Sequence, residues 1–237
     1  METNRSPTYA PREGYEPQVA VLRTVRGSMT NYNYLVVDPY SRRAVVVDPA
    51  WQIDVIERAL ADAHADLDGI LLTHSHPDHI DLAKAMARRY DCPIWMSRQE
   101  IAASGFDAPQ LVGIDETVWW AGRMLIRPLL TPGHTAGCVC YLIGDNLFTG
   151  DVLFAEGCGI CPGVEEAHQM FDSLQRLKRE LAPHTRIFPG HSFGESPGQL
   201  FSDVLQNNMY LQFHDKQGFA AFRLRPGQSR AKLFEFH

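Results

Sequence analysis

The stretch Thr73-His74-Ser75-His76-Pro77-Asp78-His79-Ile80-Asp81-Leu82 places three histidines and an aspartate within six positions, directly after the apolar run Gly69-Ile70-Leu71-Leu72. A strand that ends at Leu72 would carry His74 and His76 into a loop with their side chains on the same side. Pro77 suits the first position of a helix, whose first turn would hold Asp78 and His79. Neutral imidazole and carboxylate are ligands for zinc, iron and manganese. The stretch therefore predicts a metal site.

Three further candidate ligands lie later in the chain, each directly after a glycine at the end of a predicted strand. Glycine lets the backbone turn sharply and approach a site closely. Taken with the first cluster, they predict three nitrogen ligands for one ion, two histidines and a carboxylate for a second ion, and one carboxylate between them. Two ions about 3.5 to 4 Å apart can activate a water molecule and polarise the oxygen that it attacks. The three are His134 after Gly133, Asp151 after Gly150, and His191 after Gly190.

Composition excludes several classes of partner. The chain has 237 residues, 45% of them hydrophobic, and a formal net charge of −6, which argues against nucleic acid or an anionic membrane surface as the main partner. No apolar run reaches about 18 residues, and the N-terminus lacks the apolar stretch of a signal peptide, so we expect a soluble, cytoplasmic protein. The odd count of five cysteines favours free thiols. Nothing in the sequence assigns a role to Cys158 and Cys161, or indicates an oligomeric state.

The pattern of apolar residues predicts a loose N-terminal arm over residues 1–17 and one domain over 18–237, in which 195–237 is a short C-terminal extension. A loop is expected over 105–116. The predicted strands cover 18–23, 33–37, 44–47, 70–72, 93–96, 117–120, 124–130, 138–143, 147–149, 186–188 and 219–224. The predicted helices cover 53–65, 77–90, 97–103, 164–181 and 199–213.

The histidine run, together with Gly133-His134-Thr135, Leu147-Phe148-Thr149-Gly150-Asp151 and Gly190-His191, resembles the metallo-β-lactamase superfamily over residues 18 to 195. The resemblance implies an α/β fold of the four-layer αββα type, with the site at one edge between the sheets. It also implies two divalent metal ions; Zn²⁺ is expected, with iron and manganese as alternatives. The implied ligands are His74, His76 and His134 for one ion, Asp78, His79 and His191 for the other, and Asp151 bridging. Asp48 is expected to support the histidine loop without binding metal.

The segment from Phe148 to Phe154, followed by Gly157-Cys158-Gly159, is similar to the glyoxalase II branch, whose members hydrolyse acylglutathione thioesters. Three features depart from that branch. Ser192 and Phe193 follow His191 in place of Glu-Tyr, Ile160-Cys161-Pro162 follows Gly157-Cys158-Gly159, and the segment after residue 195 is shorter than the helical domain that binds glutathione. The stretches from Gly157 to Gly163 and from Pro189 to Gly194, with the short ending that contains Phe219 to Arg225, look more like the small hydrolases encoded with trans-acyltransferase polyketide synthases. Those enzymes remove acyl groups from acyl carrier protein.

We therefore expect a metal-dependent thioester hydrolase acting on acyl carrier protein or a small-molecule thioester, in which Asp78 both binds metal and orients the attacking water. Three alternatives remain. They are a hydroxyacylglutathione hydrolase, an iron-dependent persulfide dioxygenase with a mononuclear site, and a non-catalytic module that binds a carrier protein. The full ligand set, which includes His79 and His191, favours hydrolysis. Arg223 and Arg225 alternate in a predicted strand and are expected to contact the phosphopantetheine arm or its carrier.

Overall fold

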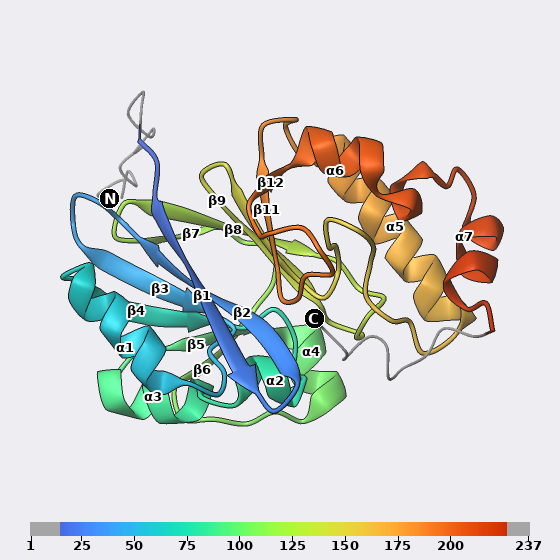
Figure 1. Cartoon of the computed structure of the whole chain (residues 1–237). Coiled ribbons are helices and arrows are strands. Elements are labelled where there is room, and N and C mark those ends of the chain that lie inside the picture. The colour runs from blue at the N-terminus through green and yellow to red at the C-terminus, as the bar shows by residue number, and fades with distance from the viewer. Residues whose placement is uncertain (1–14, 227–237) are drawn as a thin grey trace, which may run out of the picture.

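The protein is built from four layers, in which two facing β-sheets are covered by helices on their outer sides (Figure 1). The computed structural model describes residues 15–226, so most of the predicted N-terminal arm and the last residues of the predicted extension lie outside the described residues. The predicted αββα sandwich is confirmed.

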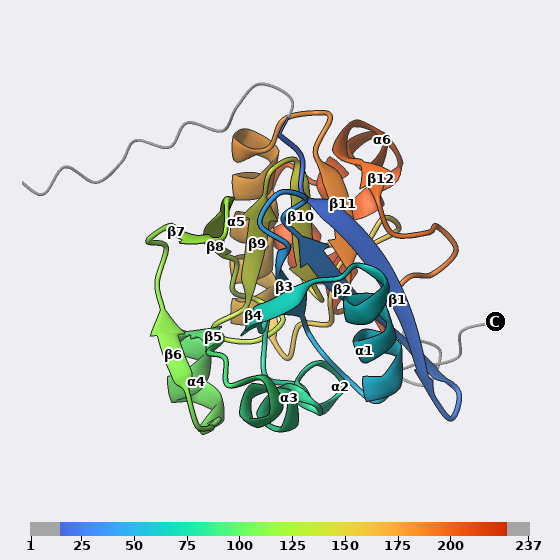
Figure 2. The same ribbon diagram turned by 90° about the vertical axis from the view of Figure 1, so that its left-hand side faces the viewer.

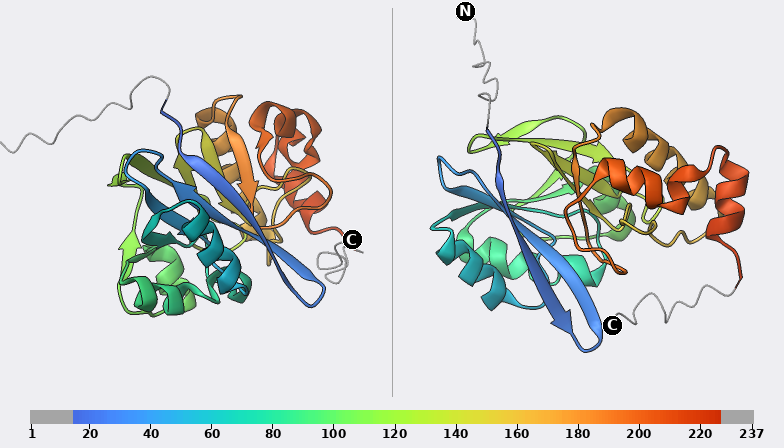
Figure 3. Two further views of the ribbon diagram at one scale, coloured as in Figure 1. Left: turned by 60° about the vertical axis from the view of Figure 1, so that its left-hand side comes forward. Right: turned by 45° about the horizontal axis from the view of Figure 1, so that its top comes forward.

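The first sheet has six strands in the order of the chain. Its first three strands pair antiparallel, and its last three continue parallel to β3. The hairpin of β1 and β2 extends past the ends of the neighbouring strands (Figure 3). The strands are β1 (Gln18–Arg26), β2 (Met29–Val37), β3 (Arg43–Val47), β4 (Asp66–Leu71), β5 (Ile94–Ser97) and β6 (Leu111–Ile114).

The second sheet has the strand order β12-β11-β10-β9-β8-β7. Strands β10 and β11 run parallel, whereas the other neighbours pair antiparallel. Parallel neighbours end at the same edge of a sheet, so the segments that follow β10 and β11 leave side by side. The strands are β7 (Trp119–Ala121), β8 (Met124–Leu130), β9 (Val139–Ile143), β10 (Asn146–Gly150), β11 (Arg186–Pro189) and β12 (Gln199–Leu200).

Helices cover both outer faces. Figure 2 shows α1 and α3 on one side of the stacked strands, and α5 and α6 on the other. The helices are α1 (Ile53–Asp62), α2 (Pro77–Ile80), α3 (Ala83–Tyr90), α4 (Arg98–Ser104), α5 (Val164–Glu180), α6 (Phe201–Asn207), the 3₁₀ helix η1 (Met209–Gln212) and α7 (Lys216–Arg223). None of the helices in residues 15–226 is both long enough and apolar enough to cross a membrane.

Successive side chains of the first sheet's strands belong to two parts of the core, one between the sheets and one under the helices. In β2 and β3, Val36 and Val45 point into the layer between the sheets, whereas Leu35 and Val46 pack under the helices of the first sheet. Successive side chains of a strand point to opposite faces, so a strand covered on both faces is apolar throughout. The central strands are thus fixed on both sides, which gives the loops at their ends a rigid base.

Four predicted elements are wrong or incomplete. The predicted helix over 77–90 is interrupted at Asp81 and Leu82, which separate α2 from α3. The predicted loop over 105–116 contains β6, a short edge strand paired with β5. The predicted helix over 199–213 is broken into β12, α6 and η1, because Asn208 ends α6 and caps η1 by accepting a hydrogen bond from the Tyr210 backbone N–H. All five cysteines are free, as expected, and the structure shows that all five are buried.

The predicted strand over 219–224 is instead helix α7. Asp215 caps this helix by accepting a hydrogen bond from the Gly218 N–H, and Phe219, Ala220 and Arg223 are buried at helical spacing. The alternating letters of Phe222-Arg223-Leu224-Arg225 therefore do not indicate a strand face. Arg223 is buried and Arg225 is exposed, so the two arginines do not share one surface as predicted.

Candidate metal centre

The structure brings all seven predicted ligands together at one edge of the two sheets. The histidine loop follows β4, Asp151 follows β10 and His191 follows β11, so the parallel pairing of β10 and β11 places these last two residues side by side. Pro77 occupies the start of α2 as predicted, and Asp78 lies in its first turn. Sequence positions more than a hundred residues apart thus meet because their strands end at the same edge.

Three histidine nitrogens form the first cluster. Nδ1 of His76 lies 3.1 Å from Nε2 of His74 and 3.0 Å from Nε2 of His134. A zinc ion binds imidazole nitrogen at about 2.0–2.1 Å with tetrahedral geometry, which separates the nitrogens by about 3.3 Å. The donor set and its spacing therefore fit one zinc-sized cation.

The second cluster combines two histidines with carboxylates. Oδ2 of Asp78 lies 3.4 Å from Nε2 of His191 and 3.7 Å from Nε2 of His79. Asp151 lies between the clusters, with Oδ2 3.5 Å from Nε2 of His191 and 3.6 Å from Nε2 of His134. Asp151 therefore has the position that a bridging carboxylate requires.

Two buried polar atoms in this cluster lack a hydrogen-bond partner among the described residues. They are Nε2 of His79 and Oδ1 of Asp151, which face each other at 3.4 Å. A buried polar group without a partner is destabilising by about 1–3 kcal/mol. A cation held between them would satisfy both atoms, so the second cluster also fits a metal ion.

The charge states of the cluster suit metal binding. Burial lowers the pKa of His74 well below its ordinary value, and the charge of His79 lowers it further, so His74 is neutral. Burial would raise the pKa of Asp78, but the hydrogen bond from His191 and the charge of His79 lower it to about 2. Burial would lower the pKa of His191, yet Asp151 and Asp78 raise it well above its ordinary value. Metal binding at such a site releases a proton.

Backbone carbonyls select the tautomers of two histidines. The Ile160 carbonyl lies 2.8 Å from Nδ1 of His134, and the Thr30 carbonyl lies 3.1 Å from Nδ1 of His191. A carbonyl oxygen can only accept a hydrogen bond, so Nδ1 of each ring carries a hydrogen, and Nε2 points into the cluster, where its lone pair is available once the ring is neutral. Both rings are thus set for metal binding through Nε2.

Asp48, which is expected to support the histidine loop without binding metal, lies against this loop. Its Oδ1 accepts a hydrogen bond from the Thr73 N–H at 2.8 Å, and its Oδ2 accepts from the Thr73 hydroxyl at 2.6 Å and from Nδ1 of His79 at 2.9 Å. These partners occupy both carboxylate oxygens. The geometry therefore agrees with a role in orienting His79 rather than in binding metal.

Two asparagines on β2 belong to the site and were missed from sequence. The Asn31 amide donates to the Asp78 carbonyl at 2.5 Å, and the Asn33 amide donates to the Asp48 carbonyl at 2.6 Å. Both side chains are buried. The sequence contains an indication of this role, because two asparagines that alternate within an apolar strand need hydrogen-bond partners when they are buried. They tie β2 to the two loops that carry Asp48 and Asp78.

Glycine at position 190 is required by close approach. A Cβ atom there would lie 2.5 Å from Cε1 of His79 and 2.7 Å from Oδ1 of Asp151. As predicted for a glycine beside a candidate ligand, the absence of a side chain at Gly190 lets its backbone lie against His79 and Asp151.

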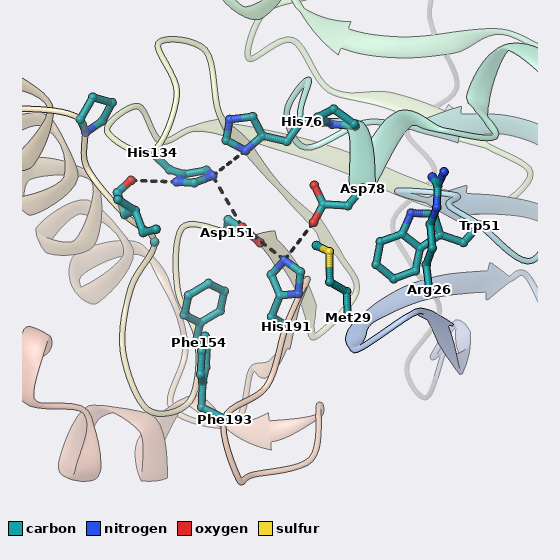
Figure 4. Close-up of a pocket in the computed structure, with 14 residues that line it drawn as sticks. Arg26, Met29, Trp51, His76, Asp78, His134, Asp151, Phe154, His191 and Phe193 are labelled. Atoms are coloured by element: carbon teal, nitrogen blue, oxygen red, sulfur yellow. Dashed lines mark hydrogen bonds and ion pairs between the residues drawn. The ribbon is translucent and has the colours of Figure 1, made fainter. Parts of the chain in front are cut away.

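A cavity of about 650 Å³ opens above the centre (Figure 4). Figure 4 shows Phe154 and Phe193 on one side of His191, with Met29, Trp51 and Arg26 on the other. Five of the predicted ligands line the cavity: His76, Asp78, His134, Asp151 and His191. Its apolar wall includes Met29, Trp51, Phe154, Ile160 and Phe193, and Arg26 is the one Lys or Arg side chain among the described residues that line it.

Arg223 does not line the cavity but binds a residue of its wall. Its Nε donates to the Gly159 carbonyl at 2.8 Å, and its side chain is buried. Gly159 and Ile160 belong to the cavity wall. Arg223 thus holds the wall in place, and substrate contact by Arg223 and Arg225 stays a prediction.

Several known proteins are similar to this chain in sequence. The family model described as the metallo-beta-lactamase superfamily matches residues 29–191. The probable polyketide biosynthesis zinc-dependent hydrolases BaeB of Bacillus velezensis and PksB of Bacillus subtilis are 44% and 42% identical over 221 residues, covering 92% of this chain and 97% of each relative. A hydroxyacylglutathione hydrolase of Synechococcus sp. is 38% identical over 172 residues, covering 69% of this chain and 64% of the relative.

Solved structures show the same architecture. ETHE1 from Myxococcus xanthus matches with a TM-score of 0.77 and 26% identity, over 91% of this chain and 95% of its own. The protein TTHA1623, solved in a di-iron-bound form, matches with a TM-score of 0.63 and 25% identity, over 80% of this chain and 99% of its own.

Proposed function

Because this chain belongs to the metallo-β-lactamase superfamily, we propose that it is a zinc-dependent thioester hydrolase of polyketide biosynthesis, acting on acyl groups carried by the phosphopantetheine arm of an acyl carrier protein. Two relatives that align with nearly the whole chain are described as probable zinc-dependent hydrolases of polyketide biosynthesis. The solved di-iron form of a more distant relative supports two metal ions in this fold.

The observation that carries the proposal is the cavity, which joins the ligand cluster to an apolar wall and to the side chain of one arginine, Arg26. An acyl chain suits the side chains of Phe154, Phe193 and Ile160. The single guanidinium of Arg26 matches the one phosphodiester of a phosphopantetheine arm. Glutathione carries two carboxylates, for which the cavity offers fewer partners.

The residues of the chain divide the work of hydrolysis. Two divalent ions, held by the two clusters, would activate water and polarise the thioester carbonyl. Asp78, fixed by Asn31, faces the cavity and orients the attacking water. A thiol has a pKa of about 8.5, so the thiolate leaves without a general acid, and no further acidic side chain is required.

A panel of thioesters with one acyl chain tests the substrate. The zinc-loaded protein is assayed with that chain on acyl carrier protein, coenzyme A and glutathione, and free thiol is measured. We expect the highest kcat/KM with the carrier protein. A preference for the glutathione thioester would establish the second candidate, a hydroxyacylglutathione hydrolase, which the 38% identical relative favours. Oxygen consumption with glutathione persulfide would instead establish a dioxygenase.

Ligand variants test the metal centre separately from the substrate. Asp78→Ala and His79→Ala should abolish thioester hydrolysis and reduce the bound zinc from two ions to one, while circular dichroism shows an unchanged fold. Full activity in either variant would refute the two-metal proposal. Metal content is measured by inductively coupled plasma mass spectrometry on the purified protein, which also shows whether zinc, iron or manganese is bound.

A further inference from the structure

Glu100 is a buried carboxylate that none of the expected ligand roles uses. It lies in the first turn of α4 and its residue is 1% exposed. Ser97 caps the helix by accepting a hydrogen bond from the Glu100 N–H at 3.0 Å. In a capping box, the glutamate at this position bonds back to the N–H of the capping serine. The carboxylate of Glu100 instead reaches two loops of the metal centre.

Each oxygen of Glu100 holds one of these loops. Oε1 accepts hydrogen bonds from the Ser75 N–H at 2.9 Å and from its hydroxyl at 2.6 Å. Oε2 accepts from the Thr135 hydroxyl at 2.6 Å and from the Gly137 N–H at 3.0 Å. Ser75 stands between His74 and His76, and Thr135 follows His134. All three histidines of the first cluster are thus next to a residue bound by Glu100.

The loop after His134 also packs closely against the start of α4. The Ser97 hydroxyl donates to the Gly137 carbonyl at 2.5 Å, so the start of α4 binds both the N–H and the carbonyl of Gly137. A Cβ atom on Gly137 would lie 2.0 Å from the Glu100 nitrogen. The loop therefore rests directly on the backbone of the helix.

We propose that Glu100 is a positioning residue of the metal centre, whose one carboxylate fixes the loop of His74 and His76 and the loop of His134 relative to each other. The nitrogens of these histidines lie 3.0–3.1 Å apart, and that spacing depends on two loops far apart in sequence. Residues that orient metal ligands in this way change metal affinity by about 10–100-fold when they are altered. This inference rests on the proposed metal centre.

Replacing Glu100 with glutamine gives a nearly isosteric test. Whichever way the new amide is turned, its NH₂ group faces a backbone N–H, either that of Ser75 or that of Gly137. One of the two loops must therefore move. We expect Glu100→Gln to bind zinc at the three-histidine site about 10–100-fold more weakly than wild type, so that one ion is retained at a chelator concentration at which wild type retains two. Zinc affinity is measured by competition with a chromophoric chelator.

Asp38→Asn is the matched control for a lost buried carboxylate. Asp38 is also fully buried and accepts hydrogen bonds from the N–H groups of Tyr40 at 3.0 Å and Arg123 at 2.8 Å, at the far end of β2 from the metal centre. We expect this variant to lose stability in urea but to bind zinc as wild type does. A Glu100→Gln protein that loses stability in the same way and keeps wild-type zinc affinity would overturn the proposal.

Milder variants keep the test open if Glu100→Gln does not fold. Ser75→Ala and Thr135→Val each remove one hydroxyl bound by Glu100. We expect each to weaken zinc binding, and the double variant to deviate from the sum of their effects, because one carboxylate serves both. Wild-type zinc affinity in both variants would refute the role of Glu100. Failure of the wild-type protein itself to bind two ions would refute the proposed metal centre.

Discussion

Replacing Asp48 with asparagine should weaken metal binding while leaving the metal-free protein nearly intact. The new amide has two orientations. With its NH₂ group toward Thr73 N–H, two donors meet, and a buried N–H left without an acceptor is destabilising by about 1–3 kcal/mol. With its NH₂ group toward His79, the amide donates to Nδ1, so the ring hydrogen moves to Nε2, the nitrogen that faces the second metal position.

In the second orientation the Thr73 N–H and His79 keep their partners, and the Thr73 hydroxyl, which donates to Oδ2 in the wild type, turns to accept from the new NH₂ group, so the melting temperature of the metal-free protein should change little. In the zinc-loaded protein, Nε2 of His79 must lose that hydrogen before it can bind an ion. A partner change of this kind weakens metal affinity by about 10–100-fold, which corresponds to about 1.4–2.7 kcal/mol. Both orientations therefore lower the stability of the zinc-loaded protein by a similar amount, and neither can avoid the loss.

The assay is zinc titration against a chromophoric chelator, together with thermal unfolding with and without zinc. Asp81→Asn is the control, because Asp81 accepts a hydrogen bond from the Trp51 N–H at 3.3 Å and, within residues 15–226, has no hydrogen bond or ion pair with His79. We expect Asp48→Asn to bind one zinc ion at wild-type affinity and the second more weakly. Two ions bound as in wild type, or a large loss of stability in the metal-free protein, would refute the reasoning about the tautomer of His79.

Two further variants test contacts around the centre. Gly190→Ala should lower stability by about 1–3 kcal/mol and reduce zinc content, because its Cβ would overlap His79, whereas Gly157→Ala, whose nearest contact is at 3.6 Å, should leave both unchanged. Equal zinc content in the two proteins would contradict this. Arg223→Met should lower the free energy of unfolding in urea by about 1–3 kcal/mol and raise KM, because the Gly159 carbonyl in the cavity wall loses its buried donor; an unchanged KM would show that the wall holds without it.

The clustering of the candidate ligands could be predicted from the sequence because each candidate, or run of candidates, follows a strand whose apolar run is short and clear. The positions of His134, Asp151 and His191 depend on where their strands end, not on the conformation of the loops between the strands. Errors in the predicted loops therefore do not affect the predicted positions of these three residues. The predicted strand around Arg223 failed for a different reason. Its apolar residues fit both a period of two and a helical period over so short a segment, and the cap at Asp215 that decides between them is a side-chain hydrogen bond.

Glu100, Asn31 and Asn33 could not be assigned from the sequence in the same way. Their side-chain hydrogen bonds join residues 15 to 47 positions apart, and no local pattern specifies which loop a buried polar side chain will meet. The chemistry of a metal centre is therefore easier to predict than its supports. Ligands are recognised by residue type, whereas supports are recognised only by contact.

The histidine loop is held on both sides of His74 by buried carboxylates. Thr73 N–H donates to Asp48 at 2.8 Å, and Ser75 N–H donates to Glu100 at 2.9 Å. Since Asp48→Asn acts on the second ion through His79, whereas Glu100→Gln acts on the three-histidine site, the two losses of zinc affinity should add in the double variant. Affinities of the four proteins, measured in one chelator series, test this directly. A loss smaller than the sum would show that both substitutions act on one ligand, His74, through its flanking backbone.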